Sequence, residues 1–153
     1  MSPNSEFKEL LNLLNQARVR YLVVGGYAVI EYTEPRYTKD FDIWVSLDRE
    51  NAERVFAALK EFGAPLIDIT VDDFTNPDLV YQMGRPPARI DVLMALKGLD
   101  FEASWRDRFV SSYFDAPTQF LSSQDLIINK RLVGRPQDLA DVEALELARK
   151  KKS

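Results

Sequence analysis

Apolar residues recur along this chain with two periods, one typical of helices and one typical of strands. Apolar side chains at 7, 10, 11, 14 and 19 follow helical spacing, whereas the run YLVV is short, wholly apolar and typical of a buried strand. The stretch DFDIWV alternates polar and apolar positions and favours a second strand. The first part of the chain is therefore predicted to form a helix over 5–19, a strand over 21–24, a short helix over 27–32, a strand over 40–45 and a helix over 46–63.

Capping residues mark several helix ends. Ser46 or Asp48 can cap the third of these helices, and Gly63 follows its end. Near the C-terminus, Ser122 stands at a capping position and Pro136 at a first-turn position. The remaining segments are predicted as a strand over 65–71, a turn or loose helix over 72–78, strands over 79–84 and 88–96, a helix over 101–107, a strand over 108–115 and helices over 122–132 and 135–151. This order indicates an α+β (α/β) fold with a mixed β-sheet flanked by helices and with helices at the C-terminus.

Length and composition limit the class of protein. With 153 residues, 46% of them apolar and 29% charged, the chain has the size and composition of one globular domain. We expect a single domain over 1–153, with a core over about 5–115 and a helical part over about 116–150. The apolar runs are too short to span a bilayer, and no basic-then-apolar leader precedes the first helix. We therefore expect a cytoplasmic protein without a membrane partner.

The chain contains neither cysteine nor histidine. This excludes disulfides, thiolate catalysis, Ser-His and Cys-His nucleophilic schemes, and the usual ligands of zinc and haem. A metal would be held by oxygen ligands, which favours Mg²⁺, Mn²⁺ or Ca²⁺. The net charge of -4 argues against a nonspecific DNA coat, and the terminal run ARKKKS is interpreted as a solvated helix end. Carboxylates and lysine remain for chemistry.

Two aspartates stand one residue apart in the predicted strand over 40–45. Because side chains alternate in a strand, Asp40 and Asp42 point to one face and their apolar neighbours to the other. In the strand over 88–96, Asp91 interrupts an apolar run, and it joins the pair if the two strands are neighbours. Three carboxylates can hold the cations that neutralise phosphates, with one free to take a proton from an acceptor hydroxyl. The alternative is that Asp40 caps a turn and Asp42 lies at a solvated strand end.

A glycine pair separates the first strand from the helix that follows it. Gly25 and Gly26 allow backbone N–H groups and a helix N-terminus to approach a phosphate closely. Arg36 and Thr38, just before the aspartates, can add a guanidinium fork and a hydroxyl to a triphosphate site. Each of these residues alone is more often structural or on the surface, so the order of all of them is what indicates a nucleotide site.

This order resembles a known enzyme superfamily. Gly-Gly, a short helix, Arg-x-Thr-x-Asp-x-Asp-Ile and a later strand aspartate are similar to the DNA polymerase beta-type nucleotidyltransferases. Within them, GGYAVIEYTEPRYTKDFDIWV is most similar to the minimal nucleotidyltransferases, including AbiEii-type abortive-infection toxins and lincosamide-type enzymes. The segment LSSQDLIINKRLVGRPQDLADVEAL is similar to the C-terminal helical motif of AbiEii-like domains. The sequence departs from the larger enzymes of this superfamily in one respect: the helix after Gly26 is short and is followed by TEP. This implies that phosphate is bound in a different way.

The resemblance implies a nucleotidyltransferase-like fold and a role for each matching residue. It implies phosphate binding by Gly25 and Gly26, Mg²⁺ or Mn²⁺ ligation by Asp40 and Asp42, a third carboxylate at Asp91 that acts as ligand or general base, and a phosphate or pyrophosphate contact by Lys130. Asp138 would be the polar residue that the toxin-like group keeps on its last helix. We interpret the neighbouring Asp141 as a charge on the helix surface.

Together these features predict an enzyme that moves a nucleoside monophosphate from an NTP to a hydroxyl with the help of Mg²⁺. The acceptor is left open among tRNA, a protein and a small molecule, and basic residues such as Lys130, Arg131 and Arg135 can guide RNA. The absence of an obvious second domain suggests a small acceptor, a homodimer that completes the cleft, or a partner. The resemblance suggests the toxin-like component of a toxin–antitoxin or phage-defence system, with a cognate antitoxin as a candidate partner. The alternative is a catalytically silent nucleotide-binding or interaction module of the same fold.

Overall fold

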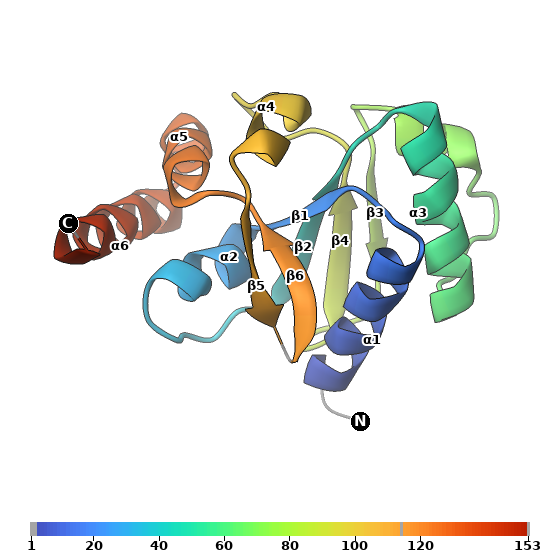
Figure 1. Cartoon of the computed structure of the whole chain (residues 1–153), viewed down its shortest axis with the longest axis horizontal. Helices are drawn as coiled ribbons and strands as arrows, with labels where there is room; N and C mark the ends of the chain where they lie inside the picture. The colour runs from blue at the N-terminus through green and yellow to red at the C-terminus, as the bar shows by residue number, and fades with distance from the viewer. Residues whose placement is uncertain (1–2, 114, 153) are drawn as a thin grey trace.

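A six-stranded mixed β-sheet forms the centre of the molecule (Figure 1). The computed structural model describes residues 3–113 and 115–152. In chain order the strands are β1 (Tyr21–Val24), β2 (Asp40–Val45), β3 (Val80–Met83), β4 (Arg89–Leu93), β5 (Phe109–Tyr113) and β6 (Ala116–Phe120). Their order across the sheet is β3-β4-β2-β1-β6-β5. The pairs β2–β4 and β1–β6 are parallel, and the other three neighbouring pairs are antiparallel.

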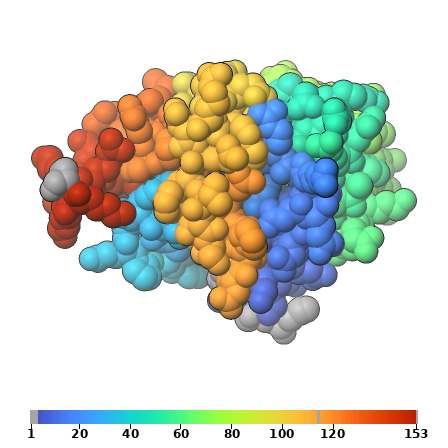
Figure 2. Space-filling model, viewed as in Figure 1, coloured from blue at the N-terminus to red at the C-terminus, as the bar shows by residue number. Residues whose placement is uncertain are grey.

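Helices cover both faces of this sheet. They are α1 (Pro3–Gln16), α2 (Gly25–Tyr32), α3 (Arg49–Phe62), the 3₁₀ helix η1 (Val71–Thr75), α4 (Phe101–Arg106), α5 (Ser123–Val133) and α6 (Pro136–Lys152). In Figure 1 the sheet is seen close to edge-on, with α1 and α3 on the right and α2, α5 and α6 on the left. The space-filling view shows the β5–β6 hairpin and α4 in the middle of the front face, between the α5–α6 pair and α1 (Figure 2). This architecture confirms the expected mixed sheet flanked by helices, with helices at the C-terminus.

The core confirms the two apolar periods. The predicted apolar positions of α1 (7, 10, 11 and 14) and Val19 are buried. In β2, Phe41, Ile43 and Val45 are buried at alternate positions, and Trp44 on the opposite face is buried too. Phe7 of α1 stacks on Phe41 of β2 with ring centroids 4.6 Å apart. The apolar face of β2 therefore packs under α1, and the opposite face, which carries Asp40 and Asp42, is turned toward the helices on the other side. None of the helices in the described part of the chain has the length and apolar character that crossing a bilayer requires.

Helix ends follow the capping residues. The Asp48 carboxylate accepts a hydrogen bond of 3.0 Å from the Asn51 N–H at the start of α3, and Gly63 ends this helix with φ of 90°. Ser122 caps α5 by accepting from the Asp125 N–H at 3.1 Å, and Pro136 is the first residue of α6. The basic run at the end of α6 is helical and exposed.

Three local predictions were wrong. Residues 65–70 form irregular chain with a turn at 67–68 instead of a strand, and Val71 begins η1, because Asp68 adopts a left-handed φ of 62°. Leu66 and Ile69 pack against the core, whereas Ile67 is exposed. The helical part starts at α5 and not at 116, because residues 116–120 form β6, which pairs in parallel with β1 despite Pro117. Helix α2 begins at Gly25 itself, two residues earlier than expected. The strand expected over 108–115 is β5, and residue 114 lies outside the described residues.

We predict that Asn51→Ala lowers the free energy of unfolding by about 2 kcal/mol, because buried backbone groups lose their partners. The Asn51 side chain is 2% exposed, accepts from the Arg20 N–H at 2.7 Å and donates to the Ser46 carbonyl at 2.7 Å. Urea denaturation measures the loss. The control Glu53→Ala, on the exposed side of the same helix, should change stability by less than about 0.5 kcal/mol. Equal losses would contradict the structural role of Asn51.

Candidate functional site

The pairing of β2 with β4 brings the three aspartates together. In this parallel ladder Asp42 lies opposite Asp91, and Asp40 lies opposite Arg89. The apolar residues between them are buried on the other face of the sheet, as the alternation predicts. Asp91 was expected to join the pair only if the two strands were neighbours, and they are.

The glycine pair lies directly against this carboxylate face. Gly25 has a φ of 68°, and a Cβ atom there would be 2.3 Å from Oδ2 of Asp42. A Cβ atom on Gly26 would be 2.6 Å from Cγ2 of Thr38 and 3.2 Å from Nη2 of Arg36. Any other residue at these positions would displace the neighbouring side chains. The two glycines therefore let the start of α2 touch Asp42 on one side and the Arg36–Thr38 segment on the other.

Two buried polar atoms at this place have no partner. Among the described residues, the buried side-chain atoms without a hydrogen-bond partner are Thr38 Oγ1, Asp42 Oδ1, Trp44 Nε1 and Ser123 Oγ. The first two belong to the cluster around the glycine pair. No side-chain hydrogen bond within the described chain caps the N-terminus of α2 there. Unpartnered buried groups are rare in folded proteins and indicate an absent ligand, ion or water.

Asp42 has an unusual acidity. Burial raises the pKa of Asp42 to about 7, and the charges of Asp91 and Asp40 act in the same direction. Lys130 and Arg89 oppose this shift only in part. The carboxylate face therefore favours an additional positive charge or a proton at neutral pH.

Arg89 is a site residue that the sequence interpretation missed. Its Nε lies 3.1 Å from Oδ1 of Asp91 and 3.7 Å from Oδ1 of Asp40. The alternation of the strand could have revealed it, because Arg89 and Asp91 are two residues apart and share a face. Arg89 supplies the cation nearest to two of the three aspartates that the sequence singled out.

A second charged cluster joins the C-terminal helices to the glycine pair. Lys130 of α5 is 7% exposed, and its Nζ lies 2.9 Å from Asp141 and 3.3 Å from Asp138, both on α6. Asp141 also accepts from Nη1 of Arg36 at 2.6 Å. Arg36, in turn, is the side chain beside Gly26. The predicted residues of the two sequence motifs are therefore linked through one chain of ion pairs, the Lys130–Asp141–Arg36 network.

The surface role expected for Asp141 was wrong. Its side chain is buried, and burial by itself would raise its pKa, yet hydrogen bonds led by that from Lys130 hold the pKa below its usual range. The hydrogen bond from Arg135 likewise lowers the pKa of Asp138. Helical spacing could have revealed this position, because Asp138, Asp141, Val142 and Leu145 form one buried stripe.

The donor set fits a divalent cation in chemistry. It consists of carboxylate oxygens, which Mg²⁺ and Mn²⁺ prefer, and it includes the unpartnered Oδ1 of Asp42. Within residues 3–113 and 115–152, however, no three Asp, Glu, His or Cys side chains are gathered closely enough to hold a metal ion. Arg89 turns toward Asp40 and Asp91 in this arrangement. Metal ligation by Asp40, Asp42 and Asp91 therefore stays a prediction.

Open space lies beside the Lys130–Asp141–Arg36 network. A groove of about 580 Å³ runs between the end of α2, the loop that follows it and α6. Arg36 and Asp141 line one end of this groove, and Lys151 and Lys152 line the other. The groove thus leads from the C-terminal lysines to the Lys130–Asp141–Arg36 network.

We predict that Asp42→Asn stabilises the metal-free protein increasingly between pH 4 and pH 7. The carboxyl of Asp42 ionises near pH 4 in the unfolded chain but keeps its proton up to about pH 7 in the folded protein. The folded state therefore loses stability as the pH rises through this window, and asparagine removes the loss. Urea denaturation in a chelator should show a difference that grows to roughly 2–4 kcal/mol and then levels off. A difference independent of pH would contradict the raised pKa.

We predict that Asp141→Asn lowers stability by about 3 kcal/mol, because it removes the carboxylate that pairs with Arg36 and leaves the buried Lys130 with Asp138 as its remaining partner. Glu146→Gln is the matched control, since Glu146 also lies on α6 and pairs with Arg131 of α5, but both of these side chains are exposed. That change should be smaller than about 1 kcal/mol. Thermal and urea unfolding of both variants measure the contrast, and similar losses would show that the buried network is unimportant for the fold.

Comparison with known protein families agrees with this geometry. A family model described as a nucleotidyltransferase of unknown function (DUF6036) matches residues 4–151. The match includes both glycines, the three aspartates and the Lys130–Asp141–Arg36 network. No curated protein matches the chain. The glycine pair, the paired strand aspartates and the C-terminal cluster thus occur in a chain that belongs to the DUF6036 family of nucleotidyltransferases.

Proposed function

We propose that this protein transfers a nucleoside monophosphate from an NTP to a hydroxyl acceptor, with Mg²⁺ or Mn²⁺ as cofactor. The observation that carries the proposal is the place of the unpartnered atoms. Thr38 Oγ1 and Asp42 Oδ1 are buried without partners on the two sides of the Gly25–Gly26 backbone. This combination provides a hydroxyl donor for a phosphate and a carboxylate for a cation within one small region.

In this proposal, each group of the site has a role that follows from its chemistry. Backbone N–H groups at the start of α2, together with Thr38, would bind phosphate oxygens. Asp40, Asp42 and Asp91 would hold the divalent cation, which supplies neutralisation of the triphosphate charge when it is bound. As the alternative to metal ligation, Asp91 would act as the general base that takes the proton from the attacking hydroxyl. In this scheme positioning and charge neutralisation supply most of the rate enhancement.

The C-terminal helices would act on the same nucleotide through Arg36. Lys130 was predicted to contact phosphate, but Asp138 and Asp141 hold its ammonium group. Asp141 also fixes the guanidinium of Arg36 beside Gly26. We infer that Arg36 meets the phosphates directly, while Lys130 and Asp138 keep the network charged and rigid.

A toxin-like role of the AbiEii type, with a cognate antitoxin, belongs to the proposal as well. It is supported by the sequence resemblance of the segment that forms α5 and α6, which the ion pairs connect to the glycine pair. A tRNA end, a protein hydroxyl and a small molecule all remain candidate acceptors. A homodimer that completes the cleft is an alternative to a partner protein.

A catalytically silent nucleotide-binding module is the second candidate. The ion pairs favour it, because Arg89 neutralises two of the three aspartates and Lys130 is neutralised by two others. A protein with these internal pairs can keep its fold without metal. The two candidates differ in whether bound NTP is consumed.

The decisive experiment offers each α-labelled NTP with Mg²⁺ or Mn²⁺ to the full chain. Bulk tRNA, cell lysate proteins and a small-molecule fraction serve as acceptors in separate reactions. We expect label in one acceptor class, and a loss of at least about a hundredfold in Asp42→Asn, because the nucleotide charge is no longer neutralised.

Asp115→Asn is the control for that variant, since Asp115 is exposed and lies between β5 and β6, outside the strands that carry the three aspartates. It should transfer label as the wild type does. NTP binding without transfer to any acceptor would support the silent module instead. Equal transfer by wild type and Asp42→Asn would refute the assigned role of the aspartates.

A further inference from the structure

Arg89 occupies the position in which the aspartate face needs a positive charge. It comes from β4, the strand that also supplies Asp91, and its backbone is in register with Asp40. Its guanidinium approaches Asp91 with two nitrogens, Nε at 3.1 Å and Nη2 at 3.5 Å. The same Nε is 3.7 Å from Asp40. One planar cation thus bridges two carboxylates of neighbouring strands.

The pairing is partly shielded from water. The Asp91 side chain is 14% exposed and that of Arg89 is 34% exposed. Two like charges about 4 Å apart repel by roughly 4 kcal/mol at an effective dielectric constant near 20. Without a cation, ionised Asp91 and its neighbours on β2 would therefore destabilise the sheet. Arg89 relieves this repulsion with a group that belongs to the chain itself.

We propose that Arg89 is an internal counter-ion that competes with the divalent cation for Asp40 and Asp91 and thereby sets how tightly the chain binds the metal. The inference rests on the proposed function, because it takes these aspartates as the metal ligands. The guanidinium and the metal need the same carboxylate oxygens, so binding of one displaces the other. Arg89 stabilises the metal-free fold and weakens metal affinity for the same electrostatic reason.

This competition accounts for two features of the site. The aspartates are adjacent in register and yet, within the described residues, not gathered around a common point as metal ligands would be. Asp40 and Asp91 pair with the guanidinium of Arg89, whereas Oδ1 of Asp42 has no partner. Displacement of the guanidinium would free Asp40 and Asp91 to turn toward Asp42.

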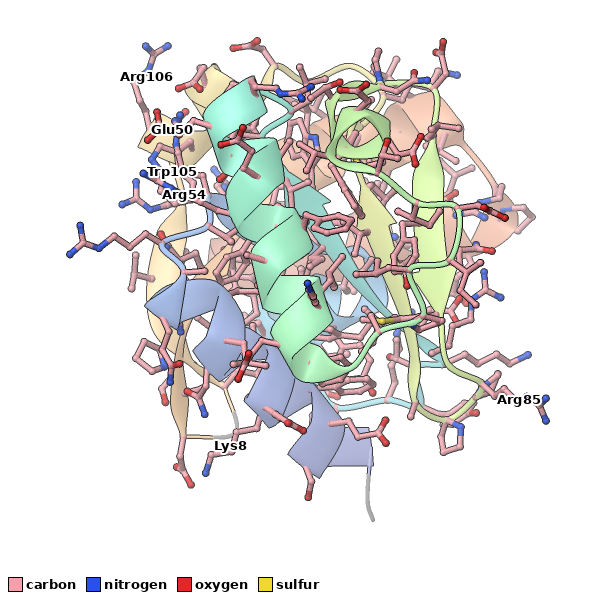
Figure 3. All side chains as sticks on the ribbon, turned by 90° about the vertical axis from the view of Figure 1, so that its right-hand side faces the viewer. Lys8, Glu50, Arg54, Arg85, Trp105 and Arg106 are labelled. Carbon is pink, nitrogen blue, oxygen red and sulfur yellow. The ribbon has the colours of Figure 1, made fainter. Side chains whose placement is uncertain are left out.

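The test compares Arg89→Gln with Arg85→Gln in the full chain. Both changes remove one positive charge, but Arg85 is exposed, and Figure 3 shows its side chain projecting away from the molecule. Binding of Mn²⁺ alone is measured from the electron paramagnetic resonance signal of the free ion. We expect Arg89→Gln to bind Mn²⁺ about two- to fivefold more tightly than wild type, the scale of one partly exposed ion pair. Arg85→Gln should bind as wild type does.

Thermal unfolding gives a readout without metal. In a chelator the midpoint of Arg89→Gln should be about 2–4 °C below that of wild type, and saturating Mn²⁺ should abolish the difference. The milder Arg89→Lys keeps the charge without the bidentate fork, and it replaces Arg89→Gln if that variant does not fold; it too should bind Mn²⁺ more tightly than wild type.

The outcomes separate this inference from the proposed function. Mn²⁺ binding by the wild type, with Arg89→Gln equal to Arg85→Gln, would overturn the role of Arg89 and leave the proposed transfer intact. Weaker Mn²⁺ binding by Arg89→Gln would also overturn it, because Arg89 would then support the metal. Absence of Mn²⁺ binding in wild type and variant alike would overturn both the competition and the metal-dependent reaction.

Discussion

The in-register parallel pairing of β2 with β4 is the constraint on which the rest of the site depends. It places the carboxylates of Asp42 and Asp91 side by side, and the alternation of β2 adds Asp40 on the same face. Such a face is unfavourable without positive charge, because like charges in a partly buried environment repel and resist ionisation. The raised pKa of Asp42 expresses this cost directly. Two features of the surrounding structure can offset this electrostatic cost.

The first feature is positive charge supplied by the chain itself. Arg89 neutralises Asp40 and Asp91 from within the sheet, and Lys130 acts on Asp42 from α5 at longer range. The second feature would be a bound ligand under the proposed function. The unpartnered oxygens of Thr38 and Asp42 lie beside two glycines whose missing side chains leave the backbone accessible. These two oxygens have unmet bonding capacity, which the proposed nucleotide and its cation would satisfy.

The C-terminal helices extend this organisation beyond the sheet. Asp141 pairs with Lys130 from α5 and with Arg36 from the loop before β2, so ion pairs on a buried carboxylate join α6 to the segment beside Gly26. A buried pair of this kind contributes little net stability but is costly to break. Its value lies in orientation, because it fixes the Arg36 guanidinium beside Gly26. The basic end of α6 and the groove beside it are carried by the same helix.

The sequence by itself determined most elements and the identity of the aspartate, glycine, Arg36 and Thr38 positions, because alternation, helical spacing and capping act over a few neighbouring residues. It also excluded cysteine and histidine chemistry. It did not reveal β6, whose strand conformation depends on pairing with β5 and with the distant β1, nor the turn at 67–68, where Asp68 has a left-handed φ. Only the tertiary structure decided that Arg89 neutralises the aspartates and that Asp141 is buried. Alternation places Arg89 on the face of Asp91, and helical spacing places Asp141 on one stripe with Val142 and Leu145. The contacts of Arg89 with Asp40 and of Asp141 with Lys130 and Arg36, however, join separate elements, and a local pattern does not contain such pairing.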